Sequence, residues 1–386
     1  MKIMNRKILY LTFEDVYTHG VLQAMVLSPI AEIAKKKPDY KFEIISFSRK
    51  KDRESLIYKK NKSNPLPKNV VVTEYVKIGS QKSRGMIAII NLLLGFLLVF
   101  KKILNCNILH IRSYAFIPII PIAKIFKKKV IWDPRGILSL EIEDLDGSKS
   151  FSTYILHQIE KLGITYSDKI ICVSEKMKEY FSSRTVKDLI VIPNPTSLED
   201  FNPKDKAKKL TVVYSGRLLK WHSQNSILMC YKALLASEKP FEFYLLTPDI
   251  ESANILFKKE NQEYQNLTIR SCSSREVRNF LNKAHVGICI IEPSKSKEYC
   301  APVKFAEYLA AELLILSNRG IGDIPEYVKE TGNGFVLESL DFDNIKVGIN
   351  KLVEKYEDSY KFNTTGRFIY TWEWNLNTMV SLYERI

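Results

Sequence analysis

Short apolar runs alternate with amphipathic, helix-like segments along most of the chain. In the first half these runs predict strands at Lys7–Phe13, Phe42–Phe47, Val70–Val76, Ile108–Ile111, Val130–Trp132, Lys169–Val173 and Leu189–Ile192. Helical patterns fall between most of them, including Val21–Lys36, Tyr154–Tyr166 and Glu175–Phe181. Strand and helix in turn, repeated in this way, predict an α/β domain with a parallel sheet.

A polar stretch with three prolines, Val191–Pro203, interrupts this alternation and is predicted to be a domain linker. The alternation then restarts, with strands predicted at Leu210–Tyr214, Phe241–Leu246, Leu267–Arg270, Val286–Ile291, Leu313–Leu316 and Gly334–Leu337. We therefore expect two Rossmann-like domains, at 1–195 and 196–367, and a C-terminal helix at 368–386 that packs back on the first domain. Because ligands of such sheets bind at the carboxyl ends of the strands, we expect a ligand in a cleft between the domains.

One apolar run is longer than the predicted strands. Met86–Phe100 is flanked by Lys82, Arg84, Lys101 and Lys102. As a helix it is about 22 Å long, which is short for the roughly 30 Å of a hydrocarbon core. Two interpretations remain open: a core helix packed on the sheet, or a helix lying in a membrane interface with its lysines among the headgroups.

The chain is basic, and the charge is unevenly placed. Of a net +15, residues 1–150 hold 27 Lys and Arg against 13 Asp and Glu, and the other 236 residues are close to neutral. A basic first half predicts an anionic partner. Nucleic acid is not favoured because no nucleic-acid motif occurs, whereas an anionic membrane surface or a phosphorylated lipid fits.

The cysteines and the start of the chain indicate the cellular compartment of the protein. The six cysteines form no CxxC pair and read as buried apolar side chains in a reducing compartment. The apolar run after Met1 is short and no cleavage-like site follows it, so no signal peptide is predicted. We expect a cytoplasmic protein that is peripheral on the inner face of the cytoplasmic membrane.

The stretch from Ala301 to Ala311 carries the first candidate chemistry. Pro302 suits a helix start, and Lys304 and Glu307 lie three positions apart on one helical face. A helix start favours phosphate, a lysine adds a full positive charge, and a glutamate one turn on can accept both hydroxyls of a ribose. The combination predicts a nucleotide-sugar site; the alternative is a surface Lys–Glu pair.

A second candidate follows the first strand of the second domain. Gly216 would let the backbone approach a ligand, and Arg217 and Lys220 offer two cations. When a sugar leaves a nucleoside diphosphate, negative charge grows on the phosphate, so cations placed there stabilise the transition state more than the ground state. The alternative is two solvated cations on a loop.

The first domain has candidates of its own at its predicted strand ends. His110 and Arg112 close one strand and are expected to face the cleft, with a buried core histidine as the alternative for His110. Gly20, in the loop after the first strand, would allow close approach of a substrate. The five histidines show no HxxxH or HxH spacing, so no metal is expected.

These motifs together resemble family-4 glycosyltransferases, which are retaining enzymes of the GT-B fold. The pattern Pro-x-Lys-x-x-Glu-Tyr-Leu-Ala at 302–310, a strand, and Gly-Ile-Gly-Asp at 320–323 is closely similar to theirs. So are Gly-Arg-Leu at 216–218 and the linker Val-Ile-Pro-Asn at 191–194. Asp-Pro-Arg-Gly at 133–136, with Glu141 shortly after, looks like a bacterial capsule and O-antigen subgroup.

The resemblance implies roles for particular residues. Arg217 and Lys220 would hold the diphosphate and Glu307 the ribose, and these three are the expected catalytic group. Gly216, Lys304 and Ser273, the last near the base, would complete the nucleotide site. On the acceptor or sugar side the expected residues are Gly20, His110, Arg112, Asp133, Arg135 and Glu141.

Two positions depart from the family pattern. Where the family often has a glutamate that contacts the donor sugar, this chain has Tyr299, with Glu298 one residue away. Where many members have a histidine, this chain has Arg135, which could bind a phosphate or form a salt bridge with Asp133 or Glu141. A retaining transfer can proceed without that histidine if the leaving phosphate takes the acceptor proton.

The resulting expectation is a metal-independent transferase that needs no cofactor beyond a UDP- or GDP-linked sugar. Its expected acceptor is a polyprenyl-diphosphate-linked glycan in surface-polysaccharide synthesis. Two alternatives stay open: a nucleotide-sugar epimerase of the same fold, and a non-catalytic relative that binds nucleotide-sugar or partner proteins.

Overall fold

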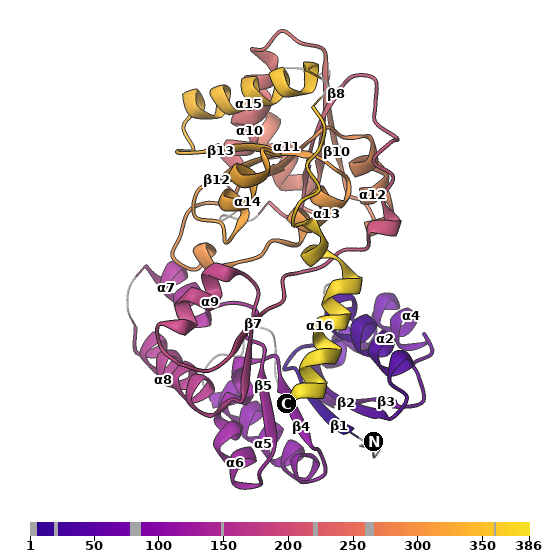
Figure 1. The fold of residues 1–386 in the computed structure, drawn as a ribbon, viewed down its shortest axis with the longest axis vertical. Helices are drawn as coiled ribbons and strands as arrows, with labels where there is room; N and C mark the ends of the chain where they lie inside the picture. Colours follow the sequence, from indigo (N-terminus) through magenta and orange to yellow (C-terminus); the bar gives the residue numbers. More distant parts are fainter. Residues whose placement is uncertain are drawn as a thin grey trace. The chain divides into compact units, whose positions relative to one another are not determined.

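The computed structural model describes residues 6–18, 22–77, 86–147, 150–218, 223–258, 266–358 and 360–386. The chain divides into two compact units (Figure 1). The first unit comprises Met1–Val173, Lys178–Ile192 and Leu376–Ile386, and the second comprises Ser174–Met177 and Pro193–Asn375.

The first unit is built on a seven-stranded parallel sheet with the order β3-β2-β1-β4-β5-β6-β7. The strand order reverses between β1 and β4, so the segments after these two strands lie at the switch point where α/β sheets bind ligands. The strands are β1 (Arg6–Leu11), β2 (Tyr40–Ser48), β3 (Val70–Val76), β4 (Ile108–Ile111), β5 (Lys129–Trp132), β6 (Lys169–Cys172) and β7 (Leu189–Val191).

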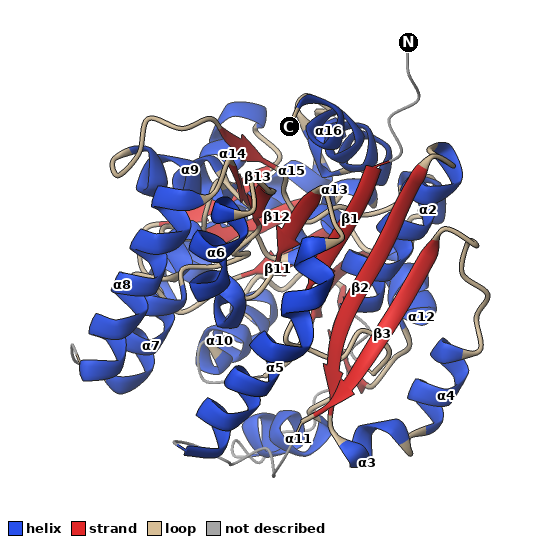
Figure 2. Cartoon of the chain, turned by 90° about the horizontal axis from the view of Figure 1, so that it is seen from below, coloured by secondary structure: helices blue, strands red, loops and turns tan. Residues whose placement is uncertain are grey.

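Helices pack on both faces of this sheet because strand side chains alternate between the faces. Phe42 of β2 meets Tyr383 of the C-terminal helix on one face, and Phe47 lies near Gly95 of α5 on the other. Figure 2 looks onto β1, β2 and β3, with α5 running along the sheet beside β1. The helices of this part of the chain are η1 (Gln23–Leu27), α2 (Ser28–Lys36), α3 (Lys50–Arg53), α4 (Leu56–Lys62), α5 (Met86–Leu104), η2 (Tyr114–Ile119), α6 (Ile120–Ile125), α7 (Leu138–Asp146), α8 (Phe151–Tyr166) and α9 (Glu175–Ser182).

The second unit repeats the plan with a six-stranded parallel sheet of order β10-β9-β8-β11-β12-β13. Its switch point lies between β8 and β11. The sequence motif at 216–217 follows β8, and the motif at 302–307 lies on the segment that follows β11. The strands are β8 (Leu210–Ser215), β9 (Phe241–Leu246), β10 (Leu267–Arg270), β11 (Val286–Cys289), β12 (Leu314–Asn318) and β13 (Gly334–Leu337).

Two apolar clusters, one on each face, hold this second sheet between its helices. One cluster joins β8 to α10, α11 and α15, and the other joins it to α12, α13 and α14. The helical segments after β7 are η3 (Leu198–Asp200), α10 (Gln224–Leu235), α11 (Ile250–Lys258), α12 (Ser274–Lys283), η5 (Lys297–Tyr299), α13 (Val303–Ala310), α14 (Ile324–Thr331), α15 (Phe342–Glu357), η6 (Arg367–Tyr370) and α16 (Trp372–Arg385).

Every predicted strand is present, and the differences lie at strand and helix ends. β11 stops at Cys289 although the apolar run continues to Ile291. The reason is the side chain of Asn318, whose amide accepts from the Ile291 N–H and donates to the Ile291 carbonyl, both at 3.0 Å, in place of a strand ladder. The helix predicted at Val21–Lys36 begins with a π-helical segment, η1, and Val21 lies outside the described residues.

Helix α5 covers the predicted segment 86–100 and continues to Leu104. Val99 and Ile103 are fully buried, so this part of the helix packs on the unit's core. Its opposite side exposes apolar side chains, and Leu97 is 72% exposed. None of the helices in the described ranges is long and apolar enough to cross a membrane.

Candidate functional site

The backbone turn after β8 brings the chain against Lys304. Gly216 has φ 137°, in the region that favours glycine. A Cβ on Gly216 would lie 3.2 Å from Lys304 Nζ and 3.4 Å from its Cε. A side chain here would therefore crowd the lysine.

Lys304 is a buried cation in the first turn of α13. The helix begins at Val303, with Pro302 as the capping residue rather than the first helical one. Lys304 Nζ lies 3.9 Å from the centroid of the Tyr214 ring and is buried with no hydrogen-bond partner among the described residues. Burial lowers the pKa of this ammonium to about 8, against the opposing effects of Cys289 and Glu307. A buried, unpaired ammonium is costly, and an anion beside it would relieve that cost.

Glu307 lies one turn further along α13, on the same face as Lys304. Burial raises the pKa of its carboxyl group, and the nearby charges of Arg278 and Lys304 counteract this only in part. The structure thus joins Gly216, Lys304 and Glu307, three of the predicted site residues, at the switch point of the second sheet.

Tyr308, which the sequence analysis did not select, holds α13 against the strand ends. Its hydroxyl accepts from the Ser215 N–H at 3.1 Å and lies 3.3 Å from the Ile288 carbonyl. Its ring fills the space over Gly287, where a Cβ would lie 2.5 Å from the ring. A glycine inside a buried strand was the available signal, because such a glycine marks close approach of another group.

Arg217 is bonded to a second residue that the sequence analysis did not select, Asp249. Its guanidinium donates to both carboxylate oxygens, with the shorter contact at 2.9 Å, and this hydrogen bonding raises the pKa of Arg217. The same carboxylate accepts from the Leu218 N–H at 2.8 Å. The Arg217 side chain is 60% exposed, so it is held at the surface of the turn. Lys220 lies outside the described residues.

The other donor-side candidates lie on neighbouring loops of the second unit. Ser273 caps α12 and forms a capping box with Glu276, which engages both its amide and its hydroxyl. Tyr299 belongs to the turn η5, and its carbonyl accepts from the Ser174 hydroxyl at 3.1 Å. Glu298 is exposed and approaches Gly320, where a Cβ would lie 4.0 Å from its Cγ. The roles assigned to these three residues stay predictions.

The first unit gathers the acceptor-side candidates around one buried carboxylate. Asp133, after β5, lies 3.4 Å from Arg112 Nη1, 3.4 Å from Arg135 Nη1 and 3.7 Å from His110 Nε2. Although burial alone would raise the pKa of Asp133, Arg135, His110 and Arg112 hold it down to about 2. Arg135 has φ 58°, a strained value for a residue with a side chain. The salt bridge between Arg135 and Asp133 that the sequence left as an alternative is present.

A cavity of about 520 Å³ opens beside this cluster. It lies at the switch point after β1 and β4, as the topology predicts for a ligand site. Arg112, Arg135 and Glu141 line it, together with Glu14 and Lys77, which the sequence analysis did not select. Gly136 is confined by Glu141, whose Oε1 would lie 2.5 Å from an added Cβ. Gly20 lies outside the described residues.

His110 is buried and does not line this cavity. Its Nδ1 lies 2.8 Å from the hydroxyl of Tyr383 on α16, and its ring packs on Tyr10 at 4.4 Å between centroids. Burial lowers the pKa of His110, in spite of the nearby Asp133. His110 therefore lies beside the Asp133 carboxylate in the core of the unit and is not part of the cavity wall.

The Asp133 cluster predicts acid sensitivity of the first unit. Because the pKa of Asp133 is lower in the folded chain than the ordinary 3.8, its contribution to stability is complete above pH 4 and is lost as the pH falls towards 2. We expect a loss of about 2 kcal/mol over this interval, measured by urea unfolding at a series of pH values. Asp133→Asn is the control: if it shows the same acid-dependent loss, the effect belongs to other carboxylates.

Among the described residues no group of three or more His, Cys, Asp and Glu is placed to hold a metal ion.

Comparison with known proteins shows the fold. No protein-family model matches the chain, and no curated protein sequence does. Among solved structures it is similar to HepE from Anabaena in complex with UDP and glucose, with 12% identity, 99% of this chain and 100% of that one covered, and a TM-score of 0.68. It is also similar to sucrose-phosphate synthase from Thermosynechococcus elongatus, with 14% identity, 98% of each chain covered and a TM-score of 0.72. A third similar structure is the lipopolysaccharide outer core galactosyltransferase WaaB in its apo form, with 14% identity, 98% of this chain and 100% of that one covered, and a TM-score of 0.68.

These matches span nearly the whole chain and include both units. The fold class is therefore GT-B, with two Rossmann-like domains built on parallel sheets, as the sequence predicted.

Proposed function

We propose that this protein is a retaining, family-4-type glycosyltransferase that moves a sugar from a UDP- or GDP-linked donor to a hydroxyl group of an acceptor. The observation that carries the proposal is the buried Nζ of Lys304, which has no hydrogen-bond partner among the described residues and lies against Gly216 at the switch point of the second sheet. A diphosphate at this place would supply the missing negative charge. The complex of HepE with UDP and glucose, on the same fold, supports a nucleotide donor.

In the proposed reaction the acceptor oxygen attacks the anomeric carbon while the bond from that carbon to the diphosphate breaks. The leaving phosphate oxygen takes the acceptor proton, so no separate base is required. Lys304 and Arg217 stabilise the charge that develops on the diphosphate, with Lys220 in the same role, and Glu307 holds the ribose. With these cations in place the reaction is proposed to need no metal.

The acceptor is proposed to bind in the cavity of the first unit. Arg112, Arg135 and Lys77 offer cations there, and Glu14 and Glu141 offer hydrogen-bond acceptors for sugar hydroxyls. The basic first half of the chain and the exposed apolar side of α5 support a lipid-linked acceptor, such as a polyprenyl-diphosphate glycan. This would place the protein in bacterial surface-polysaccharide synthesis, on the inner face of the cytoplasmic membrane.

A thermal-shift panel of UDP-, GDP- and ADP-linked sugars tests the donor site. One nucleotide class should raise the melting temperature, because a ligand at a hundred times its dissociation constant adds about 2.7 kcal/mol of stability. No shift with any of the sugars would remove the proposed donor site.

Arg217→Ala should lower turnover by about tenfold to a hundredfold. This decrease is smaller than the one expected when the Lys304 charge is removed, since Arg217 is exposed and already paired with Asp249.

Product analysis with and without an acceptor separates the alternatives. A transferase forms a glycoside only when acceptor is present, in EDTA as well as without it. An epimerase converts the donor alone, and a non-catalytic relative binds the donor with no turnover.

A further inference from the structure

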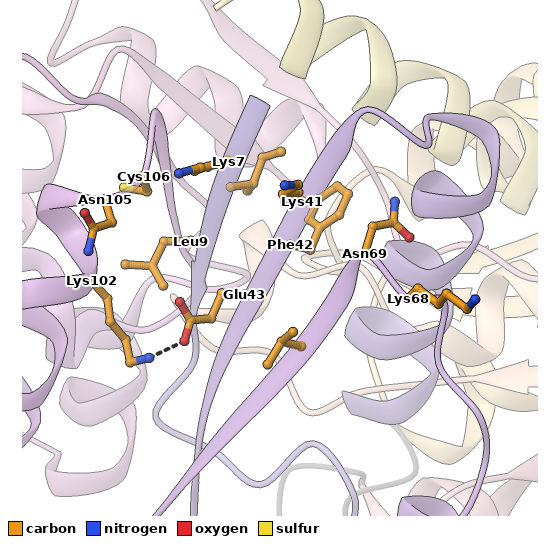
Figure 3. A pocket seen from close by; sticks show the side chains of 12 residues that line it. Lys7, Leu9, Lys41, Phe42, Glu43, Lys68, Asn69, Lys102, Asn105 and Cys106 are labelled. Atoms are coloured by element: carbon orange, nitrogen blue, oxygen red, sulfur yellow. Dashed lines mark hydrogen bonds and ion pairs between the residues drawn. The ribbon is translucent and has the colours of Figure 1, made fainter. Parts of the chain in front are cut away.

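A second cavity of the first unit lies away from the strand ends that carry the candidate acceptor site. Its volume is about 640 Å³, and it is lined where β1, β2 and β3 begin and where α5 ends. Figure 3 shows Lys7 and Lys41 towards one end of this pocket and Lys102 facing Glu43. The acceptor-side cavity follows the opposite ends of β1 and β4, so a ligand in this pocket would not be the acceptor.

The sheet face in this pocket carries two lysines at paired positions of neighbouring strands. Lys7 and Lys41 are register partners of β1 and β2, and neighbouring strands lie about 4.8 Å apart. Both side chains are exposed, and neither they nor Lys68 have an ion-pair partner among the described residues. Glu43, the one carboxylate among the described residues that line the pocket, is engaged by Lys102 and by the Thr73 hydroxyl. An anion bound between Lys7 and Lys41 would relieve their mutual repulsion.

Apolar side chains lie between the charged ones in this pocket. Leu9 lies next to Glu43 on the same sheet face, and Val71 of β3 is 56% exposed. Beyond the end of the pocket, Lys128 donates to the carbonyls of Leu104 and Cys106, which ties the end of α5 to the chain that follows α6.

An apolar ridge continues from this end of α5. We define the α5–α6 ridge as Leu97, Phe100, Leu104, Ile125 and Phe126, all of them exposed. Leu97, Phe100 and Leu104 share one face of α5, and Phe100 meets Phe126 edge to face with centroids 6.0 Å apart. Leu97 and Ile125 are 72% and 75% exposed. Exposed apolar side chains beside lysines are typical of a surface that lies on a membrane.

We infer that this pocket binds the phosphate headgroup of an anionic phospholipid while the α5–α6 ridge enters the interface of the same bilayer. Lys7 and Lys41 receive the phosphate, and Lys68 adds charge at the rim. The lipid serves as an anchor and is not consumed. The inference rests on the membrane location proposed above and not on sugar transfer.

Vesicle flotation at low salt tests this inference with the full chain. The wild type should float with phosphatidylcholine vesicles that contain phosphatidylglycerol and not with phosphatidylcholine alone. Because each lysine near an anionic surface contributes about fivefold in affinity, Lys7→Gln/Lys41→Gln should bind roughly 25-fold more weakly. The matched control, Lys329→Gln/Lys346→Gln, removes two exposed lysines of the second unit and should float like the wild type.

Three outcomes would overturn the inference. In the first, the wild type fails to float with either vesicle. In the second, both double variants lose binding equally, as they would if only net charge mattered. In the third, inorganic phosphate raises the melting temperature of the wild type but not of Lys7→Gln/Lys41→Gln, and no vesicle binds; the pocket is then a site for a soluble anion. Nucleotide-sugar binding is measured separately, so a failed donor panel with the expected flotation would sink the proposed function and leave this inference standing.

Discussion

Lys304→Met is expected to lower kcat/KM about 10²–10³-fold and to leave the protein at least as stable as the wild type. The loss follows from the position of the ammonium, which is buried beside Gly216 and has no hydrogen-bond partner among the described residues. A charge in such a site interacts more strongly with a developing phosphate charge than an exposed one does. The measurement is steady-state turnover together with urea unfolding.

The stability of this variant separates a ligand-binding role from a structural one. Burial lowers the pKa of Lys304 from 10.5 to about 8, which corresponds to a cost on the order of 3 kcal/mol for keeping the ammonium charged at neutral pH. Methionine keeps the apolar stem and removes the charge, so part of this cost is recovered. If the variant is less stable and equally active, Lys304 has a structural role and the proposed site is wrong.

Lys206 provides the matched control. Burial also lowers its pKa to about 8, but its Nζ donates to the carbonyls of Ala284 and Ala311 at 2.7 and 2.6 Å. Lys206→Met should therefore lose stability, since two carbonyls lose their donor, and should keep its kcat/KM. If Lys206→Met and Lys304→Met changed stability and kcat/KM in the same way, the distinction between a structural Lys206 and a ligand-binding Lys304 would be contradicted.

The pKa of Lys304 also predicts the pH dependence of donor binding. Below pH 8 the ammonium is charged and available to the diphosphate; as the pH rises through 8 the free protein loses this proton. The affinity for the nucleotide should fall accordingly between about pH 8 and 10, since binding must then take up a proton. In Lys304→Met this part of the pH dependence should be absent.

Gly322→Ala is expected to cost about 3 kcal/mol or more and to abolish donor binding. Gly322 has φ 45°, and a Cβ there would lie 2.0 Å from the carbonyl oxygen of Cys300, a backbone atom that no side-chain rotation can move. Its N–H donates to the Lys297 carbonyl at 3.1 Å, so the turn that carries Glu298 and Tyr299 packs directly against this glycine. Urea unfolding and the thermal-shift panel measure the two effects.

Gly366→Ala separates backbone strain from the clash. Gly366 also has a positive φ, 72°, but its nearest neighbour would be a ring carbon of Tyr327 at 3.4 Å. This variant should lose only about 1 kcal/mol and keep its donor binding. Similar losses in both variants would show that the turn at 297–300 does not depend on close contact with Gly322.

Most of the fold was predictable because its signal is local. Apolar runs such as Ile108–Ile111 and Phe241–Leu246 became strands with the predicted bounds, since a strand buried in a parallel sheet needs only a short apolar segment between turns. The end of β11 was not predictable in this way, because it depends on Asn318, a residue 27 positions further along the chain.

The candidate site was predictable in part. Lys304 and Glu307 stand out because their spacing places them on one helical face, and Gly216 stands out because it follows a strand. Asp249 gave no such signal, and Tyr308 gave only the indirect one of Gly287 in a buried strand. The two residues act through contacts with Arg217 and Ser215, 32 and 93 positions away in the chain. The cavity residues Glu14 and Lys77 were missed for the same reason.

The sequence by itself thus determined the two α/β units, the order of their elements and the helix that presents Lys304. Only the tertiary structure decided that the Lys304 ammonium is buried with no hydrogen-bond partner in the described part of the chain, that Arg217 is paired with Asp249, and that Asp133 lies beside two guanidinium groups. The physical reason is that strand and helix formation follow from neighbours along the chain, whereas burial and pairing of charge follow from neighbours in space. The environment of a charged side chain therefore depends on segments that are distant along the chain, and the sequence does not show that these segments lie close in space.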